Sequence, residues 1–278
     1  MSVRAILIAF LGGWLCLRAE RLPIRSYSTA DGLPSNQINR IVVDSRGFVW
    51  FCTPEGLSRF DGYRVTNFGV AEGLPGRSVN TLLETRSGTY FVGTSRGLSQ
   101  FSAGKGAQRF VTYRPGNTPA DDVISSLVES TDGRIWCGTL GGALFEMLSG
   151  GKFRRQPLAG LPPGREGEAI EDIAEDSCGK LWVATDFGVQ VLARDGAVER
   201  IGAKDGLPGE FVNTLFRTRE GRIWAGVRGG MALMRDGCAE GRPVYTPVMV
   251  YVPEPETSRA CTRASVDSHP LQVHRMPD

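Results

Sequence analysis

Histidine, the side chain most often used for proton transfer at neutral pH, is nearly absent from this chain of 278 residues. The two that occur, His269 and His274, lie close to the carboxyl terminus, outside the repeated part of the sequence. Acid pairs such as Glu171–Asp172 are numerous, and we interpret them as solvated or turn-forming carboxylates at strand edges. With no histidine beside a nucleophile or in a ligand set, the sequence predicts no catalytic residues, no metal site and no cofactor.

The six cysteines contain no C-x-x-C pair, which also argues against a metal site. Cys52 and Cys137 occupy equivalent places in apolar stretches, and we predict that both are buried structural thiols. Cys178 lies in a turn, and with Cys238 it forms the pair to test for a disulfide in an oxidising compartment.

Four polar side chains are candidates for ligand contact because each stands in a turn that recurs along the chain: Glu55, Arg96, Asp186 and Arg228. Turns held by a rigid scaffold often carry binding residues. The alternative is that these four are ordinary solvated turn residues. Their importance therefore depends on the elements that carry the turns.

Those elements belong to a repeat that occurs five times. Each copy has a glycine, an aromatic residue three positions later, and a second glycine six positions after the aromatic residue. The aromatic residues are separated by 41, 45, 46 and 42 residues, so only the joining loops vary: Trp50, Phe91, Trp136, Trp182 and Trp224. One large ring per copy suits packing between adjacent sheets, and a ligand platform is the alternative.

Each copy predicts a set of antiparallel strands. An apolar run rich in β-branched residues leads into a turn that ends in glycine, followed by the aromatic strand and a second turn. Outer strands are expected at 64–68, 109–113, 197–201 and within the apolar stretch 243–252. Four strands in units of about 40–45 residues are typical of β-propeller blades. We therefore predict an all-β propeller with blades near residues 31–68, 72–113, 121–156, 168–201 and 210–237.

The first and fifth copies resemble two-component regulator propeller repeats. The resemblance rests on Asp-Gly-Leu-Pro at 31–34 and 205–208, and on Gly-x-x-Trp at 47–50 and 221–224. The repeat pattern extends from about Leu22 to Gly237. Local departures are Phe91 in place of Trp, Asn-Thr-Pro at 117–119 in place of the Gly-Leu-Pro corner, and a corner at 161–163 without the leading Asp-Gly.

The resemblance implies the periplasmic input part of a membrane-bound sensor, such as a hybrid histidine kinase or a diguanylate cyclase. Such a propeller binds an unknown small molecule, glycan or peptide and has no catalytic activity of its own. The repeats are also similar to those of streptogramin lyases, which rely on a histidine at the propeller surface, and no blade here has one. Two alternatives stay open: an exported lyase-like enzyme, and a structural propeller that binds other proteins.

Residues 1–19 predict a signal peptide, because Arg4 precedes the apolar run Ala5–Leu17 and Ala19 offers a small residue at the cleavage point. A buried N-terminal segment and an uncleaved anchor are the alternatives. We expect a periplasmic or extracytoplasmic protein, with the propeller at 20–252 and a disordered tail at 253–278. Membrane attachment is expected only through a segment downstream of residue 278. The formal net charge of +2 gives no field that would gather nucleic acid.

The completeness of the ring is the last expectation. The resembling family builds seven-bladed rings, so five blades predict an open portion of one. Leu22–Ser28 is predicted to form a strand, which a closed five-bladed ring would pair with Gly230–Arg235. An open arc instead leaves two sheet faces partly bare, and we expect self-association through them.

Overall fold

The computed structural model describes residues 25–102, 109–158, 168–234 and 247–251, and this part of the chain folds into five four-stranded antiparallel sheets. The predicted signal peptide and the predicted tail lie outside it. Strands follow one another in sequence order within every sheet, so each sheet is one blade made by one repeat. The described residues contain no α-helix. The predicted all-β propeller is confirmed.

The strands of the blades are as follows. Blade 1 contains β1 (Arg40–Val43), β2 (Val49–Thr53), β3 (Gly56–Phe60) and β4 (Val65–Phe68), and blade 2 contains β5 (Val79–Glu84), β6 (Tyr90–Thr94), β7 (Gly97–Phe101) and β8 (Phe110–Tyr113). Blade 3 contains β9 (Ile124–Glu129), β10 (Ile135–Thr139), β11 (Leu144–Met147) and β12 (Phe153–Gln156), with the short turn η4 (Ser149–Gly151) before β12. Blade 4 contains β13 (Ile170–Glu175), β14 (Leu181–Thr185), β15 (Gly188–Leu192) and β16 (Val198–Ile201), and blade 5 contains β17 (Val212–Arg217), β18 (Ile223–Val227), β19 (Gly230–Met234) and β20 (Pro247–Tyr251).

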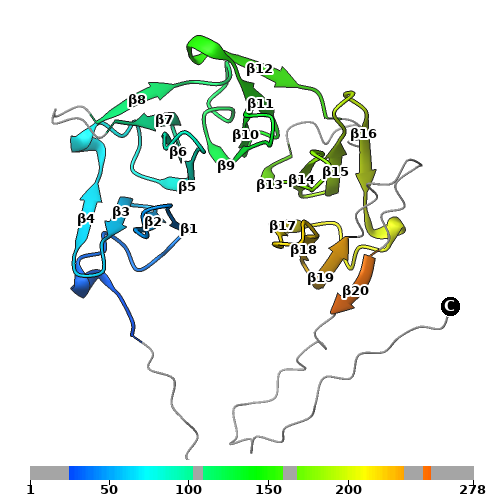
Figure 1. Ribbon diagram of the computed structural model, residues 1–278, viewed down its shortest axis with the longest axis horizontal. Coiled ribbons are helices and arrows are strands. Elements are labelled where there is room, and N and C mark those ends of the chain that lie inside the picture. The colour runs from blue at the N-terminus through cyan, green and yellow to red at the C-terminus, as the bar shows by residue number, and fades with distance from the viewer. Residues whose placement is uncertain (1–24, 103–108, 159–167, 235–246, 252–278) are drawn as a thin grey trace, which may run out of the picture.

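The five blades form an open arc around a common axis (Figure 1). The first strand of each blade lies nearest the axis, and consecutive blades are in contact through these inner strands. Figure 1 shows a gap between blade 1 and blade 5. The arrangement agrees with the predicted open portion of a larger ring.

An acid in the turn between the first two strands fixes both that turn and the aromatic core residue. In blade 1, Asp44 Oδ1 accepts hydrogen bonds from two backbone N–H groups of the turn, at 3.0 and 2.9 Å. Its Oδ2 accepts from Trp50 Nε1 at 2.9 Å and from the hydroxyl of Tyr90, in blade 2, at 2.8 Å. Asp176 binds the indole of Trp182 in the same way, also at 2.9 Å. The D-x-x-G-x-x-W spacing therefore places the carboxylate at the start of the turn within hydrogen-bond distance of the indole N–H six residues later.

The corners that lead into blades 1, 2 and 5 explain the Asp-Gly-Leu-Pro signature. Each is a short 3-10 turn that ends in a glycine with φ of 100–102°, a conformation that L side chains rarely adopt: η2 (Thr29–Asp31), η3 (Val70–Glu72) and η5 (Ala203–Asp205). The acid before the glycine accepts a hydrogen bond of 2.6–2.8 Å from the backbone N–H at the start of the turn. The leucine after the glycine is buried in all three corners.

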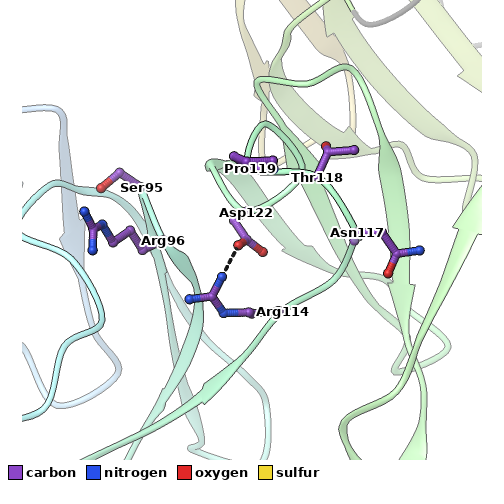
Figure 2. Close-up of a pocket in the computed structure, with 8 residues that line it drawn as sticks. Ser95, Arg96, Arg114, Asn117, Thr118, Pro119 and Asp122 are labelled. Carbon is purple, nitrogen blue, oxygen red and sulfur yellow. Dashed lines mark hydrogen bonds and ion pairs between the residues drawn. The ribbon is translucent and has the colours of Figure 1, made fainter.

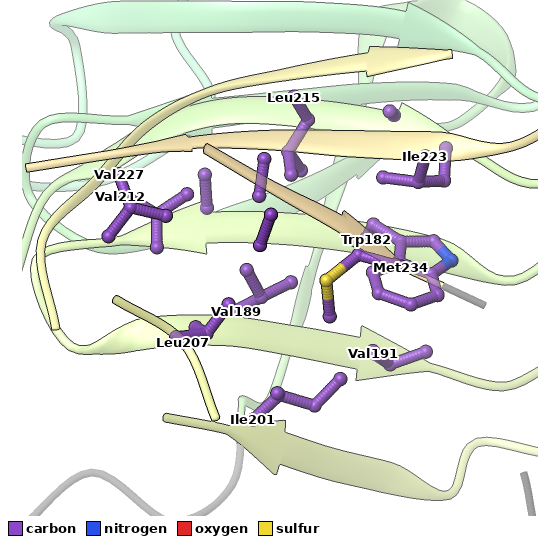
Figure 3. Packing of buried hydrophobic residues seen from close by; sticks show 14 residues of the cluster. Trp182, Val189, Val191, Ile201, Leu207, Val212, Leu215, Ile223, Val227 and Met234 are labelled. Atoms are coloured by element: carbon purple, nitrogen blue, oxygen red, sulfur yellow. The ribbon is translucent and has the colours of Figure 1, made fainter. Parts of the chain in front are cut away.

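Apolar side chains between consecutive blades form four clusters among the described residues. The largest has fourteen members and joins blades 4 and 5 (Figure 3). The aromatic repeat position is buried in four blades: Trp50, Phe91, Trp136 and Trp182. The predicted packing role is confirmed for these rings, whereas Trp224 of blade 5 is half-buried.

Two sheet faces at the ends of the arc lack a neighbouring blade. Ile41 in β1 is 57% exposed, whereas the same repeat position is 5–7% exposed in the other blades: Leu82, Leu127, Ile173 and Leu215. Met231 in β19 is 50% exposed, whereas its equivalents are 0–1% exposed: Leu57, Leu98, Ala143 and Val189. We call the surface with Ile41 and Val43 the leading face of blade 1, and the surface with Phe216 and Met231 the trailing face of blade 5.

Residues 25–28, the described part of the strand predicted for Leu22–Ser28, contain no strand and lead into η2. There the Ser28 hydroxyl accepts a hydrogen bond from Ala30 N–H, and the Ser28 N–H donates to the Asp31 carboxylate, which favours a turn over an extended ladder. The outer strand of blade 5 is instead β20, which pairs with β19. The pairing expected of a closed five-bladed ring is therefore wrong.

The described cysteines behave largely as predicted. Cys52 and Cys137 are buried free thiols, and burial raises the pKa of Cys52 to about 12. Cys178 is disulfide-bonded. Cys238, its predicted candidate partner, lies outside the described residues.

Candidate functional site: an axial cavity

A cavity of about 420 Å³ lies at the axis of the arc, where the first strands begin. It is lined by the residue eleven positions before the aromatic residue of every blade: Asn39, Asn80, Ser125, Glu171 and Asn213. The next position in three blades completes the lining with Leu140 of the β10–β11 turn: Arg40, Asp172 and Thr214. We call this the axial cavity. Its volume falls within the roughly 300–1,000 Å³ usual for small-molecule sites.

In blades 1, 2 and 3 the residue at this position also ties its blade to the next one. The three hydrogen bonds are Asn39 Nδ2 to Val79 O at 2.8 Å, Asn80 Nδ2 to Ile124 O at 2.8 Å, and Ser125 Oγ to Ile170 O at 2.5 Å. We call these bonds the axial clasps. Each clasp uses one donor of the side chain that makes it.

Blade 4 breaks this series. Glu171 stands at the clasp position, but an ionised carboxylate has no hydrogen to donate to the equivalent carbonyl, that of Val212 in blade 5. Its side chain is half-buried and makes no hydrogen bond or ion pair with a described residue. Burial raises the pKa of Glu171, and the negative charges of Asp186 and Asp172 raise it further.

Blade 5 again has an asparagine, Asn213, at the clasp position, but the described residues contain no sixth blade whose carbonyl could accept its hydrogen bond. Asn213 has the same side chain as Asn39 and Asn80, but it is exposed and makes no hydrogen bond with a described residue. The position that closes an interface in three blades is therefore open to a ligand in the last two.

Asp172 is the buried centre of the cavity floor. Its Oδ1 accepts from Ser126 of blade 3 at 2.9 Å, and its Oδ2 accepts from the hydroxyl of Thr214 and from Leu215 N–H of blade 5, both at 3.1 Å. Arg40 of blade 1 reaches the same carboxylate from across the axis at 3.3 Å. One side chain thus connects blades 1, 3, 4 and 5, and its charge compensates that of Arg40.

The chemistry available in the axial cavity is recognition of a polar molecule. The wall offers amide and carboxylate oxygens, one arginine that already has a partner, and one carboxylate that has none. Among the described residues, no group of three or more His, Cys, Asp and Glu side chains is arranged to hold a metal ion.

The four turn residues singled out from the sequence lie around the rim rather than together. Glu55 forms an ion pair with Arg77 at 3.6 Å, and the guanidinium of Arg228 lies 4.6 Å from the centre of the Phe211 ring. Asp186 is the one that bears on the axial cavity, since its charge raises the pKa of Glu171. A role for these turns in ligand contact stays a prediction.

Arg96, the fourth of them, lines a separate pocket of about 540 Å³ between blades 2 and 3 (Figure 2). Ser95 and Arg96 come from the β6–β7 turn, and the opposite wall comes from the connection between β8 and β9. On that wall Arg114 is paired with Asp122 at 2.6 Å. Arg96 has no ion-pair partner among the described residues.

Sequence reasoning missed the axial residues. The pair Glu171–Asp172 was interpreted as solvated carboxylates, but Asp172 is buried and holds three other blades. A signal was present in the repeats: the clasp position contains Asn, Asn, Ser, Glu and Asn in blade order. This position is neutral in four blades and charged only in blade 4. The charged residue there cannot donate the hydrogen bond that the position makes in blades 1, 2 and 3.

Comparison with known proteins agrees with the repeat pattern. Residues 32–55 and 206–229 match the family model described as Two component regulator propeller, and each stretch runs from a Gly-Leu-Pro corner through the aromatic strand to the following turn. The matched stretches lie in the first and fifth repeats. No curated protein matches this chain.

Several solved structures resemble this chain in fold. The extracellular domain of the putative hybrid two component system BT3049 from B. thetaiotaomicron is 23% identical, with a TM-score of 0.63, over 77% of this chain and 30% of its own. That of the putative one component system BT4673 from the same organism is 23% identical, with a TM-score of 0.58, over 67% of this chain and 25% of its own. A streptogramin B lyase is 17% identical, with a TM-score of 0.60, over 73% of this chain and 67% of its own.

These likenesses establish the fold alone, because each identity is below 25%. The match to this chain spans only 25–30% of the two sensor domains. No helix in the described part of the chain is long and apolar enough to cross a membrane.

Proposed function

We propose that this chain is an exported ligand-binding propeller that forms the N-terminal input portion of a membrane-bound signal-transduction sensor and has no catalytic activity of its own. The observation that carries the proposal is the axial cavity, to which every blade contributes a polar residue from one repeat position. A ligand there contacts all five blades, so its binding can change the packing of every blade in the arc. The sensor role is supported by the likeness to extracellular domains of sensor systems.

The proposal is tested by thermal-shift screening of the mature chain against oligosaccharides and peptides. A saturable rise in melting temperature without turnover is the expected result, because a ligand that binds only the folded state stabilises it. A ligand affinity that Asn80→Asp and Asn213→Asp together leave unchanged would contradict the axial location. No change in melting temperature with any member of either library would favour the structural, protein-binding propeller instead.

A lyase-like exported enzyme is the second candidate, motivated by the likeness to streptogramin B lyase. The two candidates differ in what happens to the bound molecule. Incubation of each binder with the chain, followed by liquid chromatography and fragmentation mass spectrometry of the small molecule, separates them. An unchanged retention time and fragmentation pattern supports the sensor. A new product supports the enzyme, even at unchanged mass, because a lyase that opens a ring by elimination yields an isomer.

The partner proposed for the two end faces is a second copy of this chain. Every interior interface joins the trailing face of one blade to the leading face of the next, and the arc exposes one face of each kind. Sedimentation velocity should show concentration-dependent association that Ile41→Asp or Phe216→Asp abolishes. A wild-type chain that stays monomeric at all concentrations would overturn this partnership.

A further inference from the structure

We infer that the axial cavity selects a small ligand with a primary ammonium group, which Glu171 binds. This inference rests on the proposed function, since it names the chemical class of the ligand for the same site. It depends on three features of the cavity: an uncompensated carboxylate, the direction of the available hydrogen bonds, and a lack of flat apolar surface.

The first feature is charge. Arg40 is the cation of the lining, and it is already paired with Asp172 at 3.3 Å. Glu171 is left without a hydrogen bond or ion pair to a described residue, although it is half-buried. A half-buried carboxylate without a partner has lost part of its hydration, so a ligand that brings a positive charge gains more here than a neutral one of the same size.

The second feature is the direction of the available hydrogen bonds. The hydroxyl of Ser125 and one N–H of each amide, Asn39 and Asn80, donate to the next blade, whereas the carboxylate of Glu171 can only accept. An ammonium group has three donors and no acceptor, and it can satisfy Glu171 and a neighbouring side-chain oxygen together. An anionic ligand would meet the charge of Glu171 and be repelled.

The third feature is the shape of the wall. The described lining contains no aromatic side chain, and Leu140 is its one apolar residue. Recognition by stacking of flat rings is therefore not provided for. What remains is a polar ligand held by charge and hydrogen bonds, within a volume of about 420 Å³.

The test uses glucosamine as the charged probe and N-acetylglucosamine and glucose as matched neutral probes, titrated into the isotopically labelled mature chain. Protein-observed NMR detects weak binding and locates it. Glucosamine should give saturable shifts at Glu171, Asp172 and Asn213 and bind about tenfold more tightly than either neutral probe, as expected for one hydrogen bond to a charged group.

The variant for the test is Glu171→Gln, whose amide keeps the size of the side chain and can donate to Val212 O. It should lose the tenfold preference, while Glu199→Gln, an exposed acid on the outer strand of the same blade, should keep it. Equal binding of all three sugars, or an unchanged preference in Glu171→Gln, would overturn the ammonium class and leave the proposed binding function intact. Absence of shifts at the cavity with glucosamine would also overturn it, whereas the library screen judges the proposed function separately.

Discussion

The interface between blades 4 and 5 is built differently from the three interfaces before it. Those three each have an axial clasp near the axis. Each also has a second bond near the first turn, in which a glutamate of the later blade accepts from a turn N–H of the earlier one at 2.7 Å: Glu84, Glu129 and Glu175. At the last interface Glu171 replaces the clasp donor and Arg217 replaces the glutamate.

The last interface is held by other means. Its apolar cluster has fourteen buried residues, against ten, seven and seven at the three earlier interfaces. The buried carboxylate of Asp172 adds hydrogen bonds to Thr214 and Leu215. The comparison indicates that an interface with a larger apolar core does not need the polar hydrogen bonds of the other interfaces. In blade 4 the residue that no longer makes such a bond is Glu171, which lines the axial cavity.

The largest expected effect concerns the apolar core of this last interface. Trp182→Ala should lower the free energy of unfolding by about 3–5 kcal/mol, because a fully buried indole leaves a cavity that the sheets cannot close. Urea denaturation measures it. Trp224→Ala is the matched control, since its half-buried ring faces the open end and should cost clearly less. Equal losses would mean that blade 5 has a neighbour not accounted for.

The comparison of interior and end faces gives the next prediction. Leu98→Ala should cost about 2–5 kcal/mol of unfolding free energy, as expected for a buried leucine in a packed interface. Met231→Ala removes the side chain at the same repeat position on the trailing face and, at a concentration where the chain is monomeric, should change stability by less than about 0.5 kcal/mol. A large cost at that concentration would show that the trailing face is covered within the monomer.

Acid should weaken the first interface before the last one. Hydrogen bonds to Asp44 and Glu84 outweigh burial and lower both carboxyl pKa values, so the folded state favours the ionised forms. Their stabilisation is complete above the unfolded pKa of about 4 and is lost as the pH falls through the lower folded values. Hydrogen exchange at decreasing pH should therefore report earlier loss of protection in β5 than in β17. Simultaneous loss would contradict the assigned difference between the interfaces.

A reciprocal substitution tests the axial clasp itself. Asn80→Asp places a carboxylate where the second interface needs a donor, so the carbonyl of Ile124 loses its hydrogen bond. We expect a loss of about 1–3 kcal/mol of unfolding free energy from the unsatisfied buried acceptor. Asn213→Asp, at the same position of blade 5, makes no such bond and should be close to neutral. A neutral Asn80→Asp would mean that the clasp contributes nothing.

Much of the fold was predictable from local sequence, because glycines and turn acids fix short turns at constant spacing. The outer strands Val65–Phe68, Phe110–Tyr113 and Val198–Ile201 end where the sequence predicted and begin one residue later. The ion pair of Arg40 with Asp172 across the axis joins residues 132 positions apart in the sequence. Local patterns contain no information about that contact.

The candidate site was less predictable, for a physical reason. The turn residues were chosen for exposure and polarity, properties that a single repeat reveals. The axial cavity arises where five repeats meet, so Glu171 gains its meaning from what Asn39, Asn80 and Ser125 do in their own blades. An alignment of the five repeats shows the charge at Glu171 when the residues eleven positions before each aromatic residue are compared.

The central claim is that Glu171 does not make the axial clasp, the hydrogen bond to the next blade that its repeat position makes in blades 1, 2 and 3. The direct measurement is the unfolding free energy of Glu171→Gln at pH 7, relative to the wild type. The glutamine amide can donate to Val212 O and restore a fourth axial clasp, while the repulsion from Asp186 and Asp172 is removed. The account predicts a gain of about 0.5–1.5 kcal/mol, the net value of one hydrogen bond. Unchanged or reduced stability would contradict it.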